Sequence, residues 1–157
     1  ELFRLRALLQ LNCAKETVEN ITQGELGAMA GCNAACATAI EAEDSDSFFR
    51  HYERFNKILM MACKMPLFIK ILMYLENFDP VTSVAELEDG RPDLQVRRIA
   101  VSDWRLRRKV LREHLTIWSA LEQRDVEAYT NALRTHIESC DKACKEGLQK
   151  MEDGKYY

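Results

Sequence analysis

Hydrophobic residues recur at steps of three and four positions along most of this chain, a spacing that places them on one face of an α-helix. The first such stretch spans residues 1–21. Its apolar positions are Leu2, Leu5, Leu9 and Cys13. No segment alternates between apolar and polar residues as a half-buried β-strand does. The pattern therefore predicts an all-α protein.

Capping residues and helix breakers divide the remainder of the chain. The predicted helices cover about residues 22–43, 45–65, 66–77, 93–100, 102–123 and 125–150. Their expected start signals are a capping box of Thr22 with Glu25, a cap at Ser45 or Ser47, Pro66 in a first turn, and caps at Ser102 and Asp125. A break at Pro80 and a turn at Gly90 predict a loop or a short irregular helix over residues 81–92. We therefore expect an antiparallel bundle of six to seven helices, folded as a single domain over residues 1–157.

The charge balance argues against one class of function. The chain has 22 Lys and Arg against 25 Asp and Glu, a net charge of −3, whereas nucleic-acid-binding domains usually carry a basic excess. The basic run is therefore interpreted as a solvated helix face; it consists of Arg105, Arg107, Arg108, Lys109 and Arg112. No apolar run reaches the ~18 residues of a membrane span, and no secretory signal opens the chain. We expect a cytoplasmic protein with no membrane partner.

The six cysteines lie among helical segments, unlike those of the loop-rich scaffolds that disulfides staple, so we expect them to be reduced. Cys32 with Cys36, and Cys140 with Cys144, are spaced i, i+4 and share a helix face. A four-thiolate metal site is one interpretation. Burial as small apolar side chains is favoured, because structural zinc cysteines usually come from tighter spacings on turns.

Five polar residues fall on helix faces that are otherwise apolar. They are Arg6 in the first helix, Tyr52 and Asn56 in the third, His114 in the penultimate helix and His136 in the last. Each alone is explained by packing or a hydrogen bond in the core or, for Arg6, by a side chain that reaches the surface. Together they indicate a shared site, because burying unsatisfied polar groups costs roughly 1–3 kcal/mol each. A ligand, a metal ion or ordered water offsets that cost.

Three segments of the chain resemble one protein family. They are ELFRLRALLQ at the start, FFRHYERFNKILMMACKMPLF in the third helix and its turn, and REHLTIWSALEQRDVEAYTNALRTHIESC in the last two helices. In this order and spacing they resemble the FCD domain, the C-terminal effector-binding domain of FadR-subgroup GntR transcription regulators. The resemblance covers essentially the whole chain. Arg6 matches the family's arginine in the first helix, and Gln10 replaces its glutamate.

The resemblance also bears on a metal site. Many family members bind a divalent metal through an Asp, a His four residues later, and two further His on the last two helices. His114 and His136 match the final pair, but Tyr52 stands in place of the Asp and Asn56 in place of the first His. Two imidazoles, an amide and a phenol are a poor donor set for Zn²⁺ or Ni²⁺. We therefore expect no cofactor; the alternative is a divalent metal (Zn, Ni or Mn) at His114 and His136.

The resemblance implies a regulatory protein and not an enzyme. Its effector is expected to bind directly, through hydrogen bonds from Tyr52, Asn56, His114 and His136. Arg6 is expected to pair with a carboxylate, which its planar guanidinium suits. A small organic acid is the preferred effector class and an acyl-CoA or fatty acid the alternative. The intact bacterial regulator is expected to be a homodimer that binds DNA through a winged helix-turn-helix domain preceding Glu1.

Two other classes of function remain open at this point. One is a helical-bundle metalloprotein, although the chain lacks the carboxylate pairs of di-iron bundles and any H-E-x-x-H motif. The other is a pure dimerisation module, in which the five polar residues only satisfy one another in the core. Metal analysis separates the first class from an effector-binding domain, and ligand screening by thermal shift separates the second.

Overall fold

The protein is an all-α bundle, as predicted. A computed structural model describes residues 2–76 and 103–152, which form seven α-helices and no β-strand within those ranges. The helices are α1 (Leu2–Asn12), α2 (Ala14–Asn20), α3 (Gln23–Glu41), α4 (Ser45–Met61), α5 (Pro66–Glu76), α7 (Trp104–Glu122) and α8 (Val126–Glu152). The loop, turn and short helix predicted between residues 79 and 100 lie outside the described residues.

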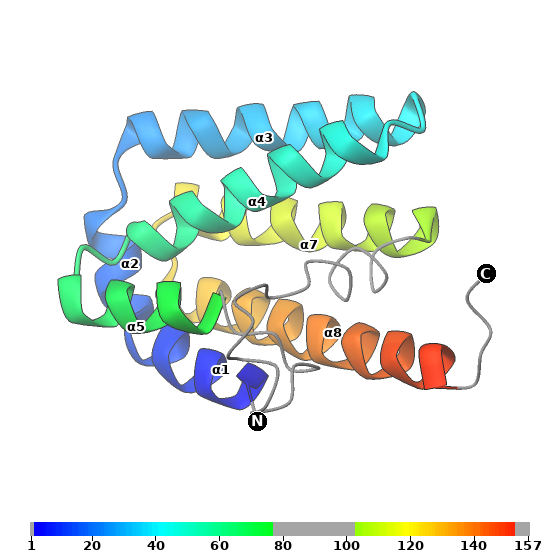
Figure 1. Cartoon of the computed structure of the whole chain (residues 1–157). Helices are drawn as coiled ribbons and strands as arrows, with labels where there is room; N and C mark the ends of the chain where they lie inside the picture. The colour runs from blue at the N-terminus through cyan, green and yellow to red at the C-terminus, as the bar shows by residue number, and fades with distance from the viewer. Residues whose placement is uncertain (1, 77–102, 153–157) are drawn as a thin grey trace.

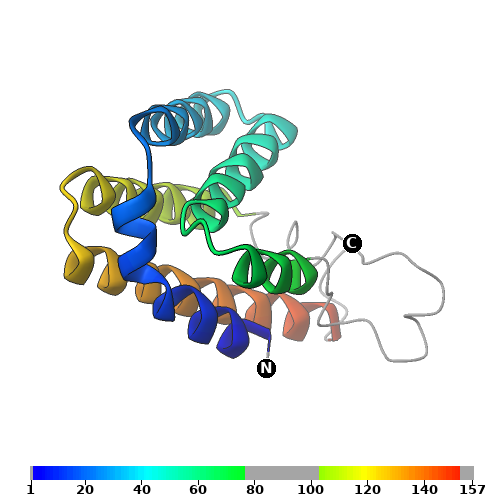
Figure 2. The ribbon, with the colours of Figure 1, turned by 90° about the vertical axis from the view of Figure 1, so that its left-hand side faces the viewer.

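Two antiparallel hairpins form most of the bundle. α3 pairs with α4, and α7 pairs with α8, as Figure 1 shows. α3 also packs on α7, so α7 lies between α3 and the layer formed by α8 and α1 (Figures 1 and 2). α1 runs antiparallel along α8 and also contacts α5. This arrangement brings the inward faces of α1, α4, α7 and α8 toward one another.

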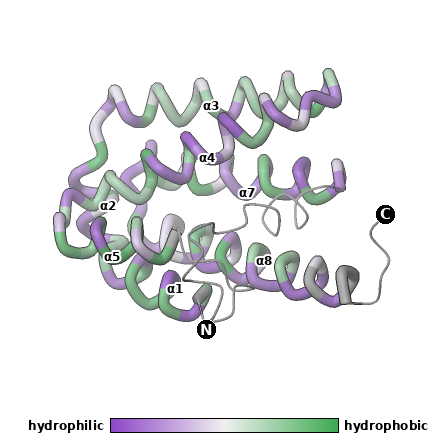
Figure 3. The backbone as a smooth tube through the Cα atoms, viewed as in Figure 1, coloured by the Kyte–Doolittle hydropathy of each residue, from purple (hydrophilic) through white to green (hydrophobic). Residues whose placement is uncertain are grey.

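Buried hydrophobic side chains form two clusters among these helices. Hydrophobic and hydrophilic residues alternate along α4, α7 and α8 (Figure 3), as in helices that bury one face. The largest fully buried side chains include Met29, Phe48, Phe55, Ile117 and Tyr129. Burying a side chain of this size stabilises the fold by roughly 1.5–3 kcal/mol. The faces that carry the candidate polar residues are therefore held by a packed hydrocarbon core.

The single helix predicted over residues 1–21 is wrong, because the chain breaks at Cys13 into α1 and α2. The Asn12 amide donates to the backbone oxygen of Leu8 at 2.6 Å, and such side-chain bonds compete with the helical backbone ladder. Thr17 Oγ1 likewise donates to the backbone oxygen of Cys13 at 2.8 Å. The break gives α1 a direction of its own along α8.

Helix starts follow the predicted chemistry with a shift of one residue in two cases. The capping box of Thr22 and Glu25 is confirmed, with hydrogen bonds in both directions. Asp125 caps α8 as predicted, accepting from the Ala128 amide at 2.9 Å. The third helix is capped by Asp44, not by Ser45 or Ser47. α7 is capped by Asp103, not by Ser102. A carboxylate accepts from the exposed helical amides as a serine does, and the adjacent Asp takes the position.

Three helices end in a residue with left-handed backbone geometry that is not glycine. These residues are Glu43 after α3 (φ 52°), Lys64 after α4 (φ 56°) and Arg124 after α7 (φ 56°). Two of them use their side chains to connect elements. Lys64 pairs with Glu25, and Arg124 Nη1 donates to the Val18 backbone oxygen at 2.5 Å. The unfavourable backbone geometry of these two residues is accompanied by contacts that a glycine cannot make.

The interpretation of the basic run as a solvated face is wrong for Arg107. This side chain is only 3% exposed. Its guanidinium lies 4.1 Å from the ring centroid of Trp104 and 5.3 Å from that of Phe48, and Nη1 donates to Ser45 Oγ at 2.8 Å. Aromatic faces attract a guanidinium and accept its flat surface. Arg107 therefore joins the start of α7 to the start of α4.

An apolar surface lies on the neighbouring helices α1 and α5. Its exposed side chains include Leu5 and Leu8 on α1, and Leu67, Ile71 and Tyr74 on α5. Leu8, Leu67 and Tyr74 are each more than 60% exposed. Among the helices in the described ranges, none combines the length and the apolar composition needed to cross a bilayer.

Candidate functional site

A stack of aromatic rings joins α4 to α7. Tyr52 and Phe55 lie three residues apart on α4 and so share a face. The His114 ring lies parallel to both, with centroid distances of 5.4 Å to Tyr52 and 3.8 Å to Phe55. His114 is 1% exposed. The histidine is thus fixed by stacking inside the bundle.

His136 on α8 meets this stack edge-on. Its ring centroid is 5.0 Å from that of His114, at an interplanar angle of 63°. His136 Nδ1 lies 2.9 Å from Glu113 Oε2, and Nε2 lies 3.7 Å from Cys140 Sγ. Both ring nitrogens therefore have partners, one from α7 and one from the next turn of α8. The two histidines that the sequence placed on separate apolar faces come together.

The two imidazoles differ in charge. Burial, with the neighbouring charge of His136, holds the pKa of His114 well below its usual value. Burial also disfavours the charged form of His136, but Cys140 and Glu113 outweigh it and raise the pKa of His136 to about 9. His136 is the imidazolium of the pair and His114 the neutral ring. His114 Nε2 is buried and makes no hydrogen bond within the described part of the chain.

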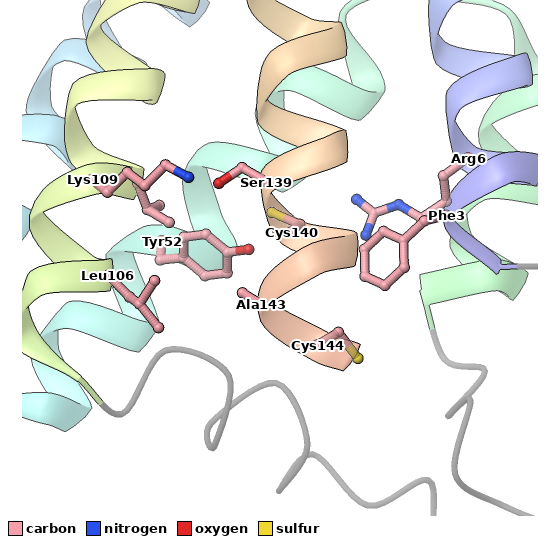
Figure 4. Close-up of a pocket in the computed structure, with 10 residues that line it drawn as sticks. Phe3, Arg6, Tyr52, Leu106, Lys109, Ser139, Cys140, Ala143 and Cys144 are labelled. Atoms are coloured by element: carbon pink, nitrogen blue, oxygen red, sulfur yellow. The ribbon is translucent and has the colours of Figure 1, made fainter. Parts of the chain in front are cut away.

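A cavity of about 50 Å³ lies beside these rings (Figure 4). Tyr52, Leu106 and Lys109 approach it from α4 and α7, and Phe3 and Arg6 approach it from α1. The remaining lining residues are Val110, Ser139, Cys140, Ala143 and Cys144. Cations thus reach an otherwise largely apolar cavity from two helices.

The five predicted residues occupy different places around this cavity. Arg6 and Tyr52 line it. His114 and His136 form the ring layer behind Tyr52. Asn56 is not among the lining residues, and its amide donates to the backbone oxygen of Tyr52 at 3.0 Å. The structure thus brings Arg6 and Tyr52 to the same cavity. It stacks His114 on Tyr52, sets His136 edge-on to His114, and turns Asn56 to its own helix.

Sequence reasoning missed three polar members of the site, namely Lys109, Glu113 and Cys140. A spacing signal existed for two of them. Cys140 follows His136 by four residues, one helical turn, and Lys109 precedes Glu113 by the same interval. The Lys109 ammonium lies 3.7 Å from Glu113 Oε1. The pairing of Glu113 with His136 joins two helices and had no local signal.

Comparison with known proteins now places the chain in a family. The model of the FCD domain matches residues 1–139. The chain belongs to the FCD domain family. The fold is similar to that of E. coli McbR/YncC, with a TM-score of 0.72 and 16% sequence identity, over 93% of this chain and 67% of that one. No curated protein sequence matches the chain.

This FCD domain is accordingly an effector-binding regulatory domain. Its residues do not fit the metal site implied by the family resemblance. Tyr52 and Asn56 stand where a carboxylate and an imidazole are expected, and Asn56 donates within its own helix. Both nitrogens of His136 are engaged by Glu113 and Cys140. Within the two described ranges, no group of three or more His, Cys, Asp or Glu side chains is placed to hold a metal ion.

Proposed function

We propose that this FCD domain binds a small organic acid and, as a homodimer, transmits that binding to a DNA-binding domain that precedes it in a bacterial GntR-type regulator. In this function the chain is a sensor and not a catalyst. The effector shifts the placement of the DNA-binding domains because it binds one arrangement better than the other.

The observation that carries the proposal is the charge around the cavity. Arg6 and Lys109 line it, and Glu113 is the carboxylate paired with Lys109. A carboxylate is therefore the ligand group whose charge suits this lining, and the planar guanidinium of Arg6 can bind it through two parallel hydrogen bonds.

The cavity also bears on the size of the effector. Its volume of about 50 Å³ accommodates roughly four water-sized groups. Phe3, Leu106 and Val110 supply apolar walls. These features favour a short acid with a small hydrocarbon part over a long acyl chain.

We further propose that the effector binds without a resident metal. Tyr52 offers a hydroxyl at the cavity, and the neutral His114 has hydrogen-bonding capacity left at Nε2. Dialysis against EDTA is then expected to leave acid binding unchanged, as measured by isothermal titration calorimetry. Retention of about one zinc or nickel ion per chain, with loss of acid binding on its removal, contradicts this part of the proposal.

The direct test is a thermal-shift and calorimetric screen of mono- and dicarboxylic acids, each compared with its neutral amide. At least one acid is expected to raise the melting temperature, because a ligand that binds only the native state stabilises it. Arg6→Gln is expected to weaken that acid by about tenfold or more, the range for a charged hydrogen bond. Arg4→Gln, at an exposed site on the same helix, is the matched control. A panel in which no acid binds, or in which amides bind equally well, refutes the proposal.

Support for the homodimer comes from the apolar surface of α1 and α5. Solvent-exposed side chains as large as Leu8, Leu67 and Tyr74, gathered on two neighbouring helices, are typical of an association surface. In a two-fold symmetric dimer the same patch of both chains forms the interface, so one apolar surface per chain is sufficient.

A further inference from the structure

Cys140 stands in a geometry that activates a thiol. Its sulfur lies 3.7 Å from His136 Nε2, and His136 Nδ1 lies 2.9 Å from Glu113 Oε2. A nucleophile beside a base, with the base oriented by a third group, is the arrangement of covalent catalysis. Cys140 and His136 come from consecutive turns of α8, while Glu113 comes from α7, so the two-helix packing assembles the set.

Cys140 is also accessible, whereas most other cysteines of the chain are not. Its side chain is only partly buried and lines the cavity together with Arg6 and Tyr52 (Figure 4). Four other cysteines are buried away from this cavity: Cys13, Cys32, Cys36 and Cys63. Of these, Cys13, Cys36 and Cys63 donate to backbone oxygens. Cys144, one turn beyond Cys140, lines the same cavity and provides an internal comparison.

The surroundings of Cys140 favour its thiolate. Burial alone raises the pKa of this thiol, but the opposing charges of His136 and Arg6 bring it below the usual value. In the core, burial raises the pKa of Cys36 to about 12. The reactive form of the sulfur is therefore stabilised at the cavity and disfavoured in the core.

We propose that Cys140 is a covalent capture site for α,β-unsaturated carbonyl compounds that enter the cavity. The sulfur forms a bond to the β-carbon while the π bond of the alkene breaks. The electron pair moves toward the carbonyl, and the α-carbon takes the proton held between Cys140 and His136. The product is a thioether with a saturated α-carbon, and the step needs no oxidant and releases no leaving group. This modification goes beyond reversible acid sensing and does not depend on it.

Acrolein, a small electrophile of this class suited to a cavity of about 50 Å³, tests the proposal on the intact chain. A time course analysed by peptide mass spectrometry is expected to show Cys140 modified at least about tenfold faster than Cys144. Cys140→Ser is expected to abolish the fast adduct, and Cys144→Ser to leave it in place. Equal rates at the two cysteines, or a fast adduct at Cys144, overturn the assignment.

The role of His136 is tested separately. At pH 7, His136→Asn is expected to slow modification of Cys140 by about tenfold or more, since it removes the group that takes the thiol proton. If this variant does not fold, the wild-type rate is compared with that of N-acetylcysteine. A wild-type rate no higher than that of the free thiol overturns the proposal.

Reversible acid binding is measured on the wild-type chain before any electrophile is added. Acid binding with no fast modification at Cys140 overturns only this inference. Fast modification at Cys140 with no acid binding overturns only the proposed effector.

Discussion

His114 is the neutral ring and His136 the protonated ring of a pair whose centroids lie 5.0 Å apart. The difference arises from their contacts. His114 stacks on Tyr52 and Phe55, which carry no formal charge, whereas His136 touches a carboxylate and a thiol. Burial, together with the charge of the protonated His136 beside it, lowers the pKa of His114 and keeps this ring neutral.

This difference predicts a dependence of stability on pH. The pKa of His114 is lowered in the folded chain, so only the unfolded chain takes up its proton as the pH falls below about 6.5. The free energy of unfolding then decreases toward acid pH, by at most about 1.4 kcal/mol per pH unit for this one proton. Urea titrations between pH 7 and pH 5 are expected to show a steeper loss for the wild type than for His114→Gln. Parallel pH profiles for the two proteins contradict the assignment.

Arg107 gives a second prediction at the residue scale. Replacing it by alanine removes the stacking on three aromatic rings and the hydrogen bond to Ser45, so we expect a loss of about 2 kcal/mol in the free energy of unfolding. Arg108→Ala, at an exposed position of the same helix, is expected to stay within about 0.5 kcal/mol of the wild type. Chemical denaturation measures both. Equal effects mean that Arg107 contributes no more than a surface charge.

The site was predictable from sequence only where a polar residue interrupts an apolar stripe. That signal found His114 and His136, whose rings do meet, and Arg6 and Tyr52, which line the cavity. It gave no means to find Glu113, which belongs to an ordinary charged run and acquires its partner only when α7 packs on α8. Charged side chains at helix edges look alike in a sequence, and tertiary packing decides which become buried.

At the scale of elements, three residues that follow helices have a backbone geometry that is unfavourable for residues other than glycine. Glu43, Lys64 and Arg124 adopt positive φ angles, which cost non-glycine residues about 1 kcal/mol or more. Lys64 and Arg124 contribute contacts between elements. Glu43 is exposed and follows a helix whose cap, Ala42, has ordinary geometry. Replacing Glu43 with glycine therefore removes the backbone cost with the least loss of side-chain contacts.

Glu43→Gly is accordingly expected to raise the free energy of unfolding by about 0.5–1 kcal/mol. Ala42→Gly is the matched control, because a right-handed position (φ −83°) gains nothing from glycine and loses about the same amount to backbone entropy. Urea denaturation of the two variants measures the contrast. A destabilised Glu43→Gly contradicts the argument.

The element boundaries show where sequence reasoning succeeds and fails. The capping box at Thr22 was predictable because both partners lie within four residues. The break at Cys13 was not, because the apolar period continues through it and the competing Asn12 bond is a detail of side-chain geometry. Periodicity reports which face is buried, and it does not report whether the helix axis stays straight.

At the scale of the whole molecule, the apolar surface of α1 and α5 leads to a prediction about assembly. The chain of 18.2 kDa is expected to sediment as a dimer at micromolar concentration. Leu67→Glu places a charge within the surface and is expected to shift the mass to the monomer, because an unpaired charge in an apolar interface costs several kcal/mol. Arg108→Glu, at an exposed position on α7 outside this surface, is the control. A Leu67→Glu dimer as stable as the wild type places the interface elsewhere.

The interruption at Cys13 makes α1 a separate short helix. α1 packs on α8 and carries Arg6 in its second turn. An effector that draws the Arg6 guanidinium toward the cavity is expected to shift α1 relative to α2, which Thr17 and Val18 hold in the core. In the proposed regulator, the DNA-binding domain that precedes α1 is the element that receives this shift.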